Sequence, residues 1–286
     1  MKNMYIDELQ IHDYQDNTLG YLVNSDIDGL AFPLLRKSSY ERPGEYGDYL
    51  SNTLYSGRLI TLTGRVWGDS LTQYNERRRA LQQYFSYQKD SYGHPVKRTL
   101  KFTTMDDLEL QVNVVAQSPL RMDYKNLLAS EWQIDLYSPD FYIESQTEHT
   151  QGLLAPAGGG FVLPFILPIV FDTKVGGTLV IENLGTTQYY PTITFNGDLT
   201  HPVLYNTTID KYIDLDYDIA MADTPVIVDN RNKTIKQGST PLMSARGVGS
   251  SWLWLEPGEN IFTLTTSDSG DDGNVQIAYR DSYLGV

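Results

Sequence analysis

Short segments of alternating apolar and polar residues, separated by turns, dominate this sequence. Residues 58–67, 99–104, 108–116 and 132–137 are rich in β-branched or aromatic side chains and repeat with a period of two. A period of two places successive side chains on opposite faces of a strand. These segments therefore predict half-buried strands and a mainly β fold, with a hairpin joining 99–104 to 108–116.

One segment breaks this pattern and predicts a helix. Ser70 to Gln73 has the form of a capping box, in which the serine hydroxyl accepts from a backbone amide and the glutamine reaches back. An apolar stripe follows at a spacing near 3.6, made of Leu71, Tyr74, Leu81 and Phe85. We expect one long helix, over residues 70–87, with this stripe inside its own domain.

A glycine-rich stretch, residues 151–160, divides the 286-residue chain into halves of different pattern. The length suits one large or two medium domains. We expect an N-terminal domain at 1–150 and a C-terminal domain at 151–286. In the second half, seven short strands separated by turns predict an antiparallel β-sandwich or jelly roll. The expected strands are 178–182, 191–195, 212–215, 225–228, 251–255, 260–265 and 275–279.

Charge and composition exclude several functions. The chain has 22 Lys and Arg against 36 Asp and Glu, a formal charge of −14, and both halves are acidic. Binding to nucleic acid phosphates needs clustered cations, and the one dense run, Arg77 to Arg79, is better explained as a solvated helix face. With no cysteine, disulfides and thiolate metal sites are excluded.

No targeting or membrane segment is expected. The first residues contain no apolar leader core. The longest apolar run, residues 161–171, contains Pro164 and Pro168 and is too short to span a bilayer.

No motif predicts a catalytic residue, a cofactor site or a metal site. The four histidines lack ligand spacing, and neither a nucleophile elbow nor a phosphate-binding glycine loop occurs. Asp214, Asp216 and Asp218 alternate and would share one face of a strand, which does not place two carboxylates on either side of a sugar bond. We interpret them as a solvent-facing acidic strand, and we expect no enzyme activity.

Two further features have competing interpretations. Trp252 and Trp254 would share one face of a strand, either as sandwich core, the reading we favour, or as a platform for stacking sugars. Residues 267–274 resemble a calcium loop but lack the spacing and the terminal glutamate of an EF-hand. A polar hairpin turn is the simpler interpretation of this loop.

The order of motifs along nearly the whole chain resembles the distal tail protein (Dit) of phages with long, non-contractile tails. The first half contains residues 49–64, the capped helix and then Leu136 to Tyr142, which closes that half. The second half contains residues 183–186, residues 190–197 and, near its end, residues 252–260. Each motif alone is weak, and their order and spacing carry the resemblance.

The resemblance implies a structural protein that forms a homo-hexameric ring from its N-terminal domain, a sandwich-like or barrel-like β domain with one α-helix. A C-terminal galectin-like β-sandwich would lie outside the ring. The ring would join the tail tube to tail-tip, lysin-type and receptor-binding or baseplate proteins, at the distal end of the virion tail, after assembly in the host cytoplasm. DNA would pass through the lumen without being specifically bound, which the acidic composition suits.

Two alternatives stay open from the residues themselves. A lectin-like carbohydrate-binding module without catalysis would use the paired tryptophans, and a glycoside hydrolase would use Asp214 to Asp218.

Overall fold

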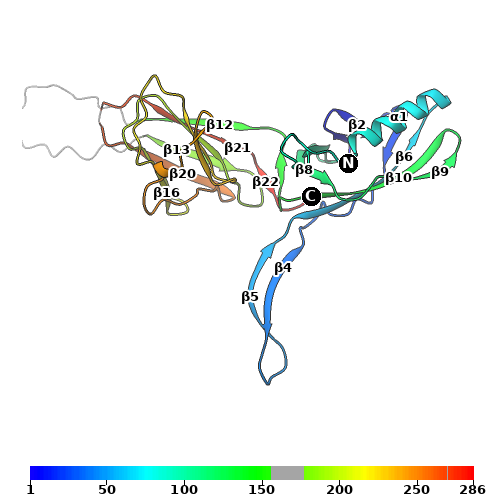
Figure 1. Ribbon diagram of the computed structural model, residues 1–286, viewed down its shortest axis with the longest axis horizontal. Coiled ribbons are helices and arrows are strands. Elements are labelled where there is room, and N and C mark those ends of the chain that lie inside the picture. The colour runs from blue at the N-terminus through cyan, green and yellow to red at the C-terminus, as the bar shows by residue number, and fades with distance from the viewer. Residues whose placement is uncertain (156–176, 269) are drawn as a thin grey trace, which may run out of the picture. The chain divides into compact units, whose positions relative to one another are not determined.

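A computed structural model describes residues 1–155, 177–268 and 270–286 of the chain (Figure 1). The apolar run at 161–171 and the glycines of 156–160 lie outside these residues. The described residues form two compact units: unit 1 contains Met1–Gln146 and Tyr283–Val286, and unit 2 contains Thr147–Ser282. The chain therefore passes between the units twice. The start of the glycine-rich stretch, residues 151–154, belongs to a strand of unit 2, β12 (His149–Leu154).

Unit 1 is a β structure with one α-helix, as the sequence predicts. Its main sheet has the order β2-β1-β7-β8-β10-β6-β3, with β9 added beside β10. The strands are β1 (Asn3–Ile6), β2 (Leu9–Asp13), β3 (Tyr21–Val23), β6 (Arg58–Trp67), β7 (Arg98–Thr103), β8 (Glu109–Ala116), β9 (Arg121–Asn126), β10 (Ala129–Ser138) and β11 (Ile143–Ser145). The last strand, β22 (Ser282–Tyr283), pairs with β11.

This sheet bends around a single core. Strands β8 and β10 pair only through Leu136 with Ala116 and Tyr137 with Val115, whereas β10 pairs with β6 along its whole length. Side chains from both halves of the sheet enter one cluster, including Phe102, Trp132 and Ile134. The predicted strands at 58–67 and 132–137 and the hairpin of β7 and β8 are confirmed.

Helix α1 (Leu71–Tyr84) covers one side of this core. The Ser70 hydroxyl accepts from the Gln73 backbone N–H at 3.2 Å, and Gln73 Oε1 accepts from the Asp69 N–H at 2.7 Å. The capping prediction is thus confirmed, although the helix ends three residues earlier than expected. The predicted stripe is wrong at its first member, because Leu71 is 56% exposed while Tyr74, Leu81 and Phe85 are buried.

Unit 2 is a sandwich of two antiparallel sheets around its own core. One sheet has the order β12-β21-β14-β17-β18-β19 and the other β13-β20-β15-β16. The strands are β13 (Thr178–Asn183), β14 (Thr192–Asn196), β15 (Val203–Asn206), β16 (Lys211–Asp214), β17 (Val226–Asp229), β18 (Thr234–Gln237), β19 (Thr240–Pro241), β20 (Gly258–Thr265) and β21 (Asn274–Tyr279), with a short 3-10 helix, η1 (Met243–Ala245). Phe195 and Ile277 from one sheet and Phe262 from the other enter the same core. Six of the seven strands expected in this half are present.

Residues 251–255 do not form the strand that the sequence predicts. Leu253 and Leu255 are buried, but only Leu255 makes a bridge, to Tyr189. The alternation of apolar residues arises because this extended segment packs its leucines on the core, and not because the segment is a strand of a sheet. No helix among the described residues is long and apolar enough to cross a membrane.

Candidate functional site: an exposed hairpin and an apolar groove

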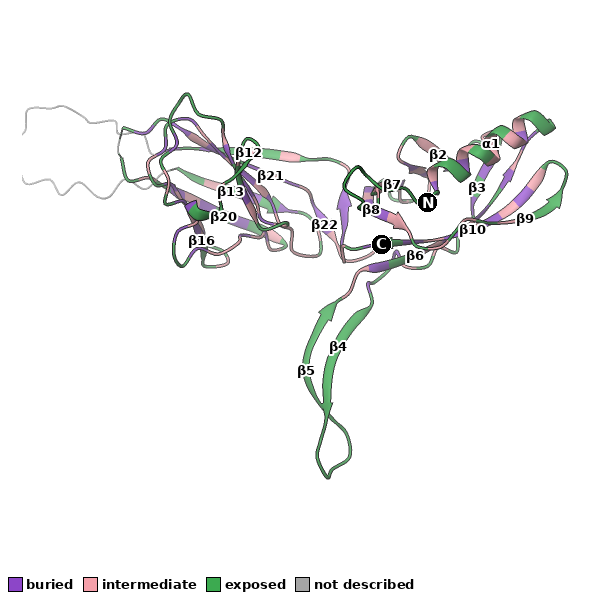
Figure 2. Cartoon of the chain, in the orientation of Figure 1, coloured by how far each residue is buried: buried purple, intermediate pink, exposed green. Residues whose placement is uncertain are grey.

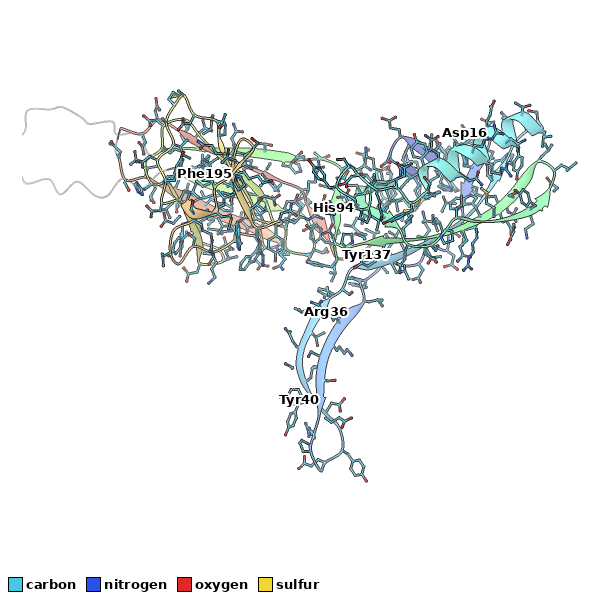
Figure 3. All side chains as sticks on the ribbon, viewed as in Figure 1. Asp16, Arg36, Tyr40, His94, Tyr137 and Phe195 are labelled. Atoms are coloured by element: carbon cyan, nitrogen blue, oxygen red, sulfur yellow. The ribbon has the colours of Figure 1, made fainter. Side chains whose placement is uncertain are left out.

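A two-stranded hairpin stands away from the rest of unit 1. Among the strands that the structure describes, β4 (Leu35–Glu41) and β5 (Asp48–Tyr55) pair only with each other, and every residue in them is exposed (Figures 1 and 2). We call residues 34–55 the arm. Figure 3 labels Arg36 and Tyr40 along it. An isolated two-stranded hairpin is at best marginally stable in water, so the arm is typical of a segment that is completed by contact with another chain.

The arm presents large apolar side chains to solvent. The exposed ones on the arm and just before it are Phe32, Leu34, Leu35, Tyr40, Tyr46, Tyr49, Leu50, Leu54 and Tyr55. Soluble monomers rarely expose so many apolar groups together, and such patches mark interaction sites. Within the arm, Tyr40 and Tyr49 pack at 5.4 Å between ring centroids, and the Arg42 guanidinium lies 4.8 Å from the Tyr49 ring.

A buried arginine fixes the base of the arm. Arg58, which begins β6, is 1% exposed, and its guanidinium donates to five backbone carbonyls. Nε donates to Phe141 at 2.8 Å, Nη1 donates at 3.1–3.4 Å to Gly29, Leu30 and Ala31, and Nη2 donates to Leu284. No carboxylate among the described residues forms an ion pair with it. Burial lowers the pKa of Arg58 to about 10, which leaves it charged at neutral pH.

Glycines allow the backbone segments around Arg58 to approach closely. A Cβ on Gly285 would lie 1.7 Å from the Ala31 carbonyl oxygen, and one on Gly29 would lie 1.9 Å from the Leu59 oxygen. Gly29 also has a φ of +87°, which disfavours other residues. The Val286 N–H donates to the Leu30 carbonyl at 3.2 Å. The segment just before the arm therefore lies against residues 284–286, a contact that no local sequence pattern indicates.

An apolar groove opens elsewhere on unit 1. It has a volume of about 580 Å³ and is lined mainly by apolar residues of β1, β2, β3 and the segments beside them. The lining residues are Met1, Met4, His12, Tyr14, Leu22, Val23, Asn24, Ser25, Ile27 and Met105. His12 is buried, its Nδ1 accepts from the Val23 N–H at 3.3 Å, and burial lowers its pKa. Burial at the wall of the groove therefore favours the neutral form of the His12 imidazole.

The predicted acidic strand is only partly correct. The segment does alternate, with Leu215 buried and Tyr217 partly buried between the aspartates and Ile219 buried just after them, but β16 ends at Asp214. Asp216 and Asp218 lie on either side of His201, with Oδ1 atoms 3.1 Å from Nε2 and 2.9 Å from Nδ1 respectively. The two carboxylates thus flank an imidazole, and this arrangement gives no support to the glycoside hydrolase alternative.

The tryptophans are not the sandwich core. Trp252 and Trp254 are both partly buried, and the leucines between and after them enter the core instead. Trp252 packs against the edge of the core beneath Arg246, whose guanidinium carbon lies 5.3 Å from the ring centroid. Trp254 Nε1 donates to Glu256 Oε1 at 2.7 Å. The favoured core interpretation is therefore wrong for Trp254 and holds only in part for Trp252.

The loop at 267–274 is not a hairpin turn. It connects β20 to β21, which belong to different sheets, so it crosses from one face of the sandwich to the other. Asp271 is buried, and its carboxylate accepts from the Thr200 N–H at 2.8 Å and the Thr200 hydroxyl at 3.0 Å. The Asp271 carboxylate therefore holds this connection between the two sheets against Thr200. Across the described ranges, no cluster of three or more His, Asp or Glu side chains is placed to hold a metal ion.

Comparison with known proteins agrees with this architecture. Residues 184–283 match the family model described as the C-terminal domain of a siphovirus-type tail component. The chain is similar in fold to the Dit protein (gp 19.1) of phage SPP1, with a TM-score of 0.66 and 15% identity over 98% of each chain. That protein is described as a paradigm of the hub adsorption apparatus in phages that infect Gram-positive bacteria. A chain of the phage p2 baseplate in its activated conformation with calcium gives a TM-score of 0.44 and 12% identity, over 90% of this chain and 89% of that one. No curated protein matches.

The matched segment defines the class of one domain: residues 184–283 are similar to the C-terminal domain of siphovirus-type tail components. The resemblance to distal tail proteins is also confirmed, because the chain has the fold of the SPP1 Dit hub protein along almost its whole length.

Proposed function

We propose that this protein forms a homo-hexameric ring at the distal end of the tail and joins the tail tube to the tail-tip or baseplate proteins. The observation that carries the proposal is the arm: all residues of its strands are exposed, and the two strands pair with no other strand that the structure describes. The family match and the fold similarity to a hub protein supply the context.

A ring of identical subunits uses heterologous contacts, in which one patch meets a different patch on the neighbour. The arm suits such a contact because it offers apolar side chains and unpaired strand edges away from its own core. In this proposal the N-terminal domain, residues 1–150, builds the ring. The C-terminal domain, residues 151–286, is an outer galectin-like sandwich.

The acidic composition supports passage of DNA through the ring. A formal charge of −14 per subunit repels phosphate, and an acidic lumen prevents DNA from adhering as it passes. We further propose that the ring assembles in the host cytoplasm and contacts tail tube protein, a lysin-type tail-tip protein and receptor-binding or baseplate proteins.

Light scattering coupled to size-exclusion chromatography tests the ring directly. The purified chain is expected to elute as a hexamer that appears as a ring in electron micrographs. A variant in which residues 34–55 are replaced by a short Gly-Ser turn is expected to remain folded and to be monomeric. A wild-type chain that stays monomeric at micromolar concentration, or a hexamer that survives loss of the arm, would contradict the proposal.

A further inference from the structure

Four partly exposed side chains of unit 2 gather on one face of two extended segments. The segments, residues 188–190 and 254–256, are joined by the antiparallel bridge between Tyr189 and Leu255. Leu255 lies in the core of the sandwich and Tyr189 packs against it. Successive side chains of an extended segment point to opposite sides, so the residues on either side of the bridge face outward together. We call these four residues the aromatic patch: Gln188, Tyr190, Trp254 and Glu256.

Hydrogen bonds connect the side chains of the aromatic patch in two pairs. Gln188 Nε2 donates to the Tyr190 hydroxyl at 3.2 Å, and Trp254 Nε1 donates to Glu256 Oε1 at 2.7 Å. Burial raises the pKa of Tyr190, and the negative charge of Glu256 raises it further. The two pairs therefore adjoin, and the Tyr190 hydroxyl keeps its hydrogen at neutral pH.

Buried asparagines hold the backbone of the aromatic patch in place. Asn206 Nδ2 donates to the Trp254 carbonyl at 3.0 Å. Asn230 donates to the Pro191 carbonyl and accepts from the Leu253 N–H, both at 2.8 Å, so that one side chain ties the two segments together. A rigid platform loses little freedom when a ligand binds, which favours affinity. The asparagines that bond to the backbone of these segments or beside them are each at most 1% exposed: Asn183, Asn206, Asn230 and Asn260.

The aromatic patch presents open polar atoms beside its rings. Gln188 Oε1 and Glu256 Oε2 have no hydrogen-bond partner among the described residues, so both can accept. The Tyr190 hydroxyl accepts from Gln188 and still has a hydrogen to donate. A matching ligand needs donors and acceptors close together on an apolar framework. Sugar hydroxyls serve as both, and the C–H face of a pyranose ring packs on an aromatic ring.

A proline-rich peptide fits this set of atoms less well. Such peptides also dock on exposed tyrosine and tryptophan rings. However, proline has no backbone N–H, so these peptides offer carbonyl acceptors and few donors. The open acceptors of Gln188 and Glu256 would stay unpaired beneath such a ligand, which costs binding free energy.

We propose that the aromatic patch binds one pyranose ring of a neutral saccharide. The sugar face packs on Trp254 and Tyr190, and Glu256 and Gln188 bond to hydroxyls at the edge of the ring. No cation among the described residues forms an ion pair with Glu256, so its carboxylate disfavours acidic sugars. The inference concerns unit 2 alone and does not rest on the proposed ring.

Trp252 provides a matched comparison within the same segment. It lies two positions before Trp254 and is also partly buried, but it packs against the edge of the core. The guanidinium carbon of Arg246 lies 5.3 Å from the centroid of the Trp252 ring. An arginine over this ring face leaves no room for a sugar on the same face. The stacking surface is therefore formed by Trp254 with Tyr190, and not by the two tryptophans.

Saturation-transfer NMR on the full chain tests the proposal. The probes are neutral mono- and disaccharides built on glucose, galactose, mannose and their N-acetyl derivatives, and at least one is expected to receive saturation through its ring C–H protons. Trp254→Ala is expected to weaken the affinity for that sugar by about tenfold or more. Trp252→Ala is expected to leave it within about twofold of wild type. Circular dichroism during thermal unfolding checks that both variants are folded.

A charge-specific variant keeps the proposal testable if Trp254→Ala fails to fold. Glu256→Gln retains an acceptor for Trp254 Nε1 and removes the negative charge. Wild type is expected to bind methyl β-D-glucoside about fivefold or more tightly than methyl β-D-glucuronide, and Glu256→Gln should bring the two affinities within about twofold of each other. Asp223→Asn, at an exposed position of unit 2, is the control and should retain the wild-type preference.

Several results would overturn the sugar site. These are the absence of transfer to every probe, equal transfer with wild type and Trp254→Ala, and a preference for the glucoside that survives Glu256→Gln. Binding of a hexaproline peptide that is lost in Trp254→Ala, with no binding of sugars, would assign the patch to peptides instead. None of these results bears on the ring, which light scattering measures separately.

Discussion

Arg58 illustrates how one residue connects distant parts of unit 1. Its guanidinium is buried, and it neutralises the partial charge of five carbonyls from three separate segments of the chain. Arginine suits this role because its donors form a rigid planar fork, whereas lysine offers a single compact ammonium. The residue therefore positions the start of the arm, the segment at Phe141 and the final residues relative to one another.

Arg58→Met is expected to lower the free energy of unfolding of unit 1 by roughly 3 kcal/mol, because it leaves buried carbonyls without donors. Urea denaturation at fixed protein concentration, with hydrogen exchange of β6 to report on unit 1, measures the change. Arg65→Met is the control: Arg65 is exposed and pairs with Glu131 at 3.2 Å, so its loss should cost less than about 1 kcal/mol. Equal effects from the two substitutions would contradict the anchoring role.

His12 predicts a dependence of stability on pH. Burial lowers the pKa of His12 below 6.5, so near and below pH 6.5 the unfolded chain binds a proton that the folded chain resists. Stability of unit 1 is therefore expected to fall as the pH decreases from 6.5 through the lowered pKa. In His12→Asn, denaturation series between pH 5 and pH 7 should show a shallower slope than wild type, and an unchanged slope would contradict this role of His12.

At the scale of elements, only part of the apolar stripe of α1 packs against the core of unit 1. Tyr74 and Leu81 face the core, and Phe85, just past the helix end, contacts Trp132 at 5.7 Å between ring centroids. Leu71 belongs to the same stripe by spacing but lies in the first turn, beyond the edge of the core. The stripe therefore packs within its own unit over its last three positions only.

A matched pair of substitutions tests this difference. Leu81→Asp buries an unpaired charge at a fully buried position and is expected to unfold unit 1, with a cost above about 4 kcal/mol. Leu71→Asp, in the same helix and 56% exposed, is expected to change stability by less than about 0.5 kcal/mol, because acids suit the first turn. Circular dichroism during thermal unfolding distinguishes them, and a folded monomer from Leu81→Asp would instead assign the helix to the ring interface.

At the scale of the whole molecule, the chain crosses between the units twice. Unit 1 needs Tyr283–Val286, which lie beyond all of unit 2 in the sequence. A cut in the glycine-rich stretch after β12 would therefore not by itself release two complete units, since β12 would stay with the N-terminal piece although it belongs to unit 2. A test of the proposed division at residue 150 therefore has to supply Tyr283–Val286, the return segment, to the N-terminal fragment.

Two fragments provide that test. A fragment ending at Glu148 lacks the Leu284 carbonyl that accepts from Arg58, and it is expected to be less stable than unit 1 by about 2 kcal/mol or more and to form rings poorly. A fragment of residues 1–146 joined by a Gly-Ser linker to 281–286 is expected to be more stable and to form rings. Thermal unfolding and light scattering compare the two, and equal behaviour would show that the return segment is dispensable.

Local pattern determined much of this protein. The period of two in β6 and β10, the hairpin of β7 and β8 and the serine cap of α1 are set by neighbours in the sequence, because strand alternation and helix capping act within a few residues. The family resemblance was likewise predictable, since it depends on the order of such motifs.

Only the tertiary structure decided the rest. The segment at 251–255 alternates like a strand but makes one bridge with the residues that the structure describes, from Leu255 to Tyr189. The loop at 267–274 joins two different sheets, and its Asp271 accepts from the Thr200 N–H. The sequence of the arm does not distinguish it from an ordinary pair of strands. Whether a strand is exposed depends on which other elements pack against its faces, and that is set by the tertiary structure. Arg58 and Leu284 meet across 226 positions of sequence, and no local pattern encodes a contact whose acceptor is a backbone carbonyl that every residue possesses.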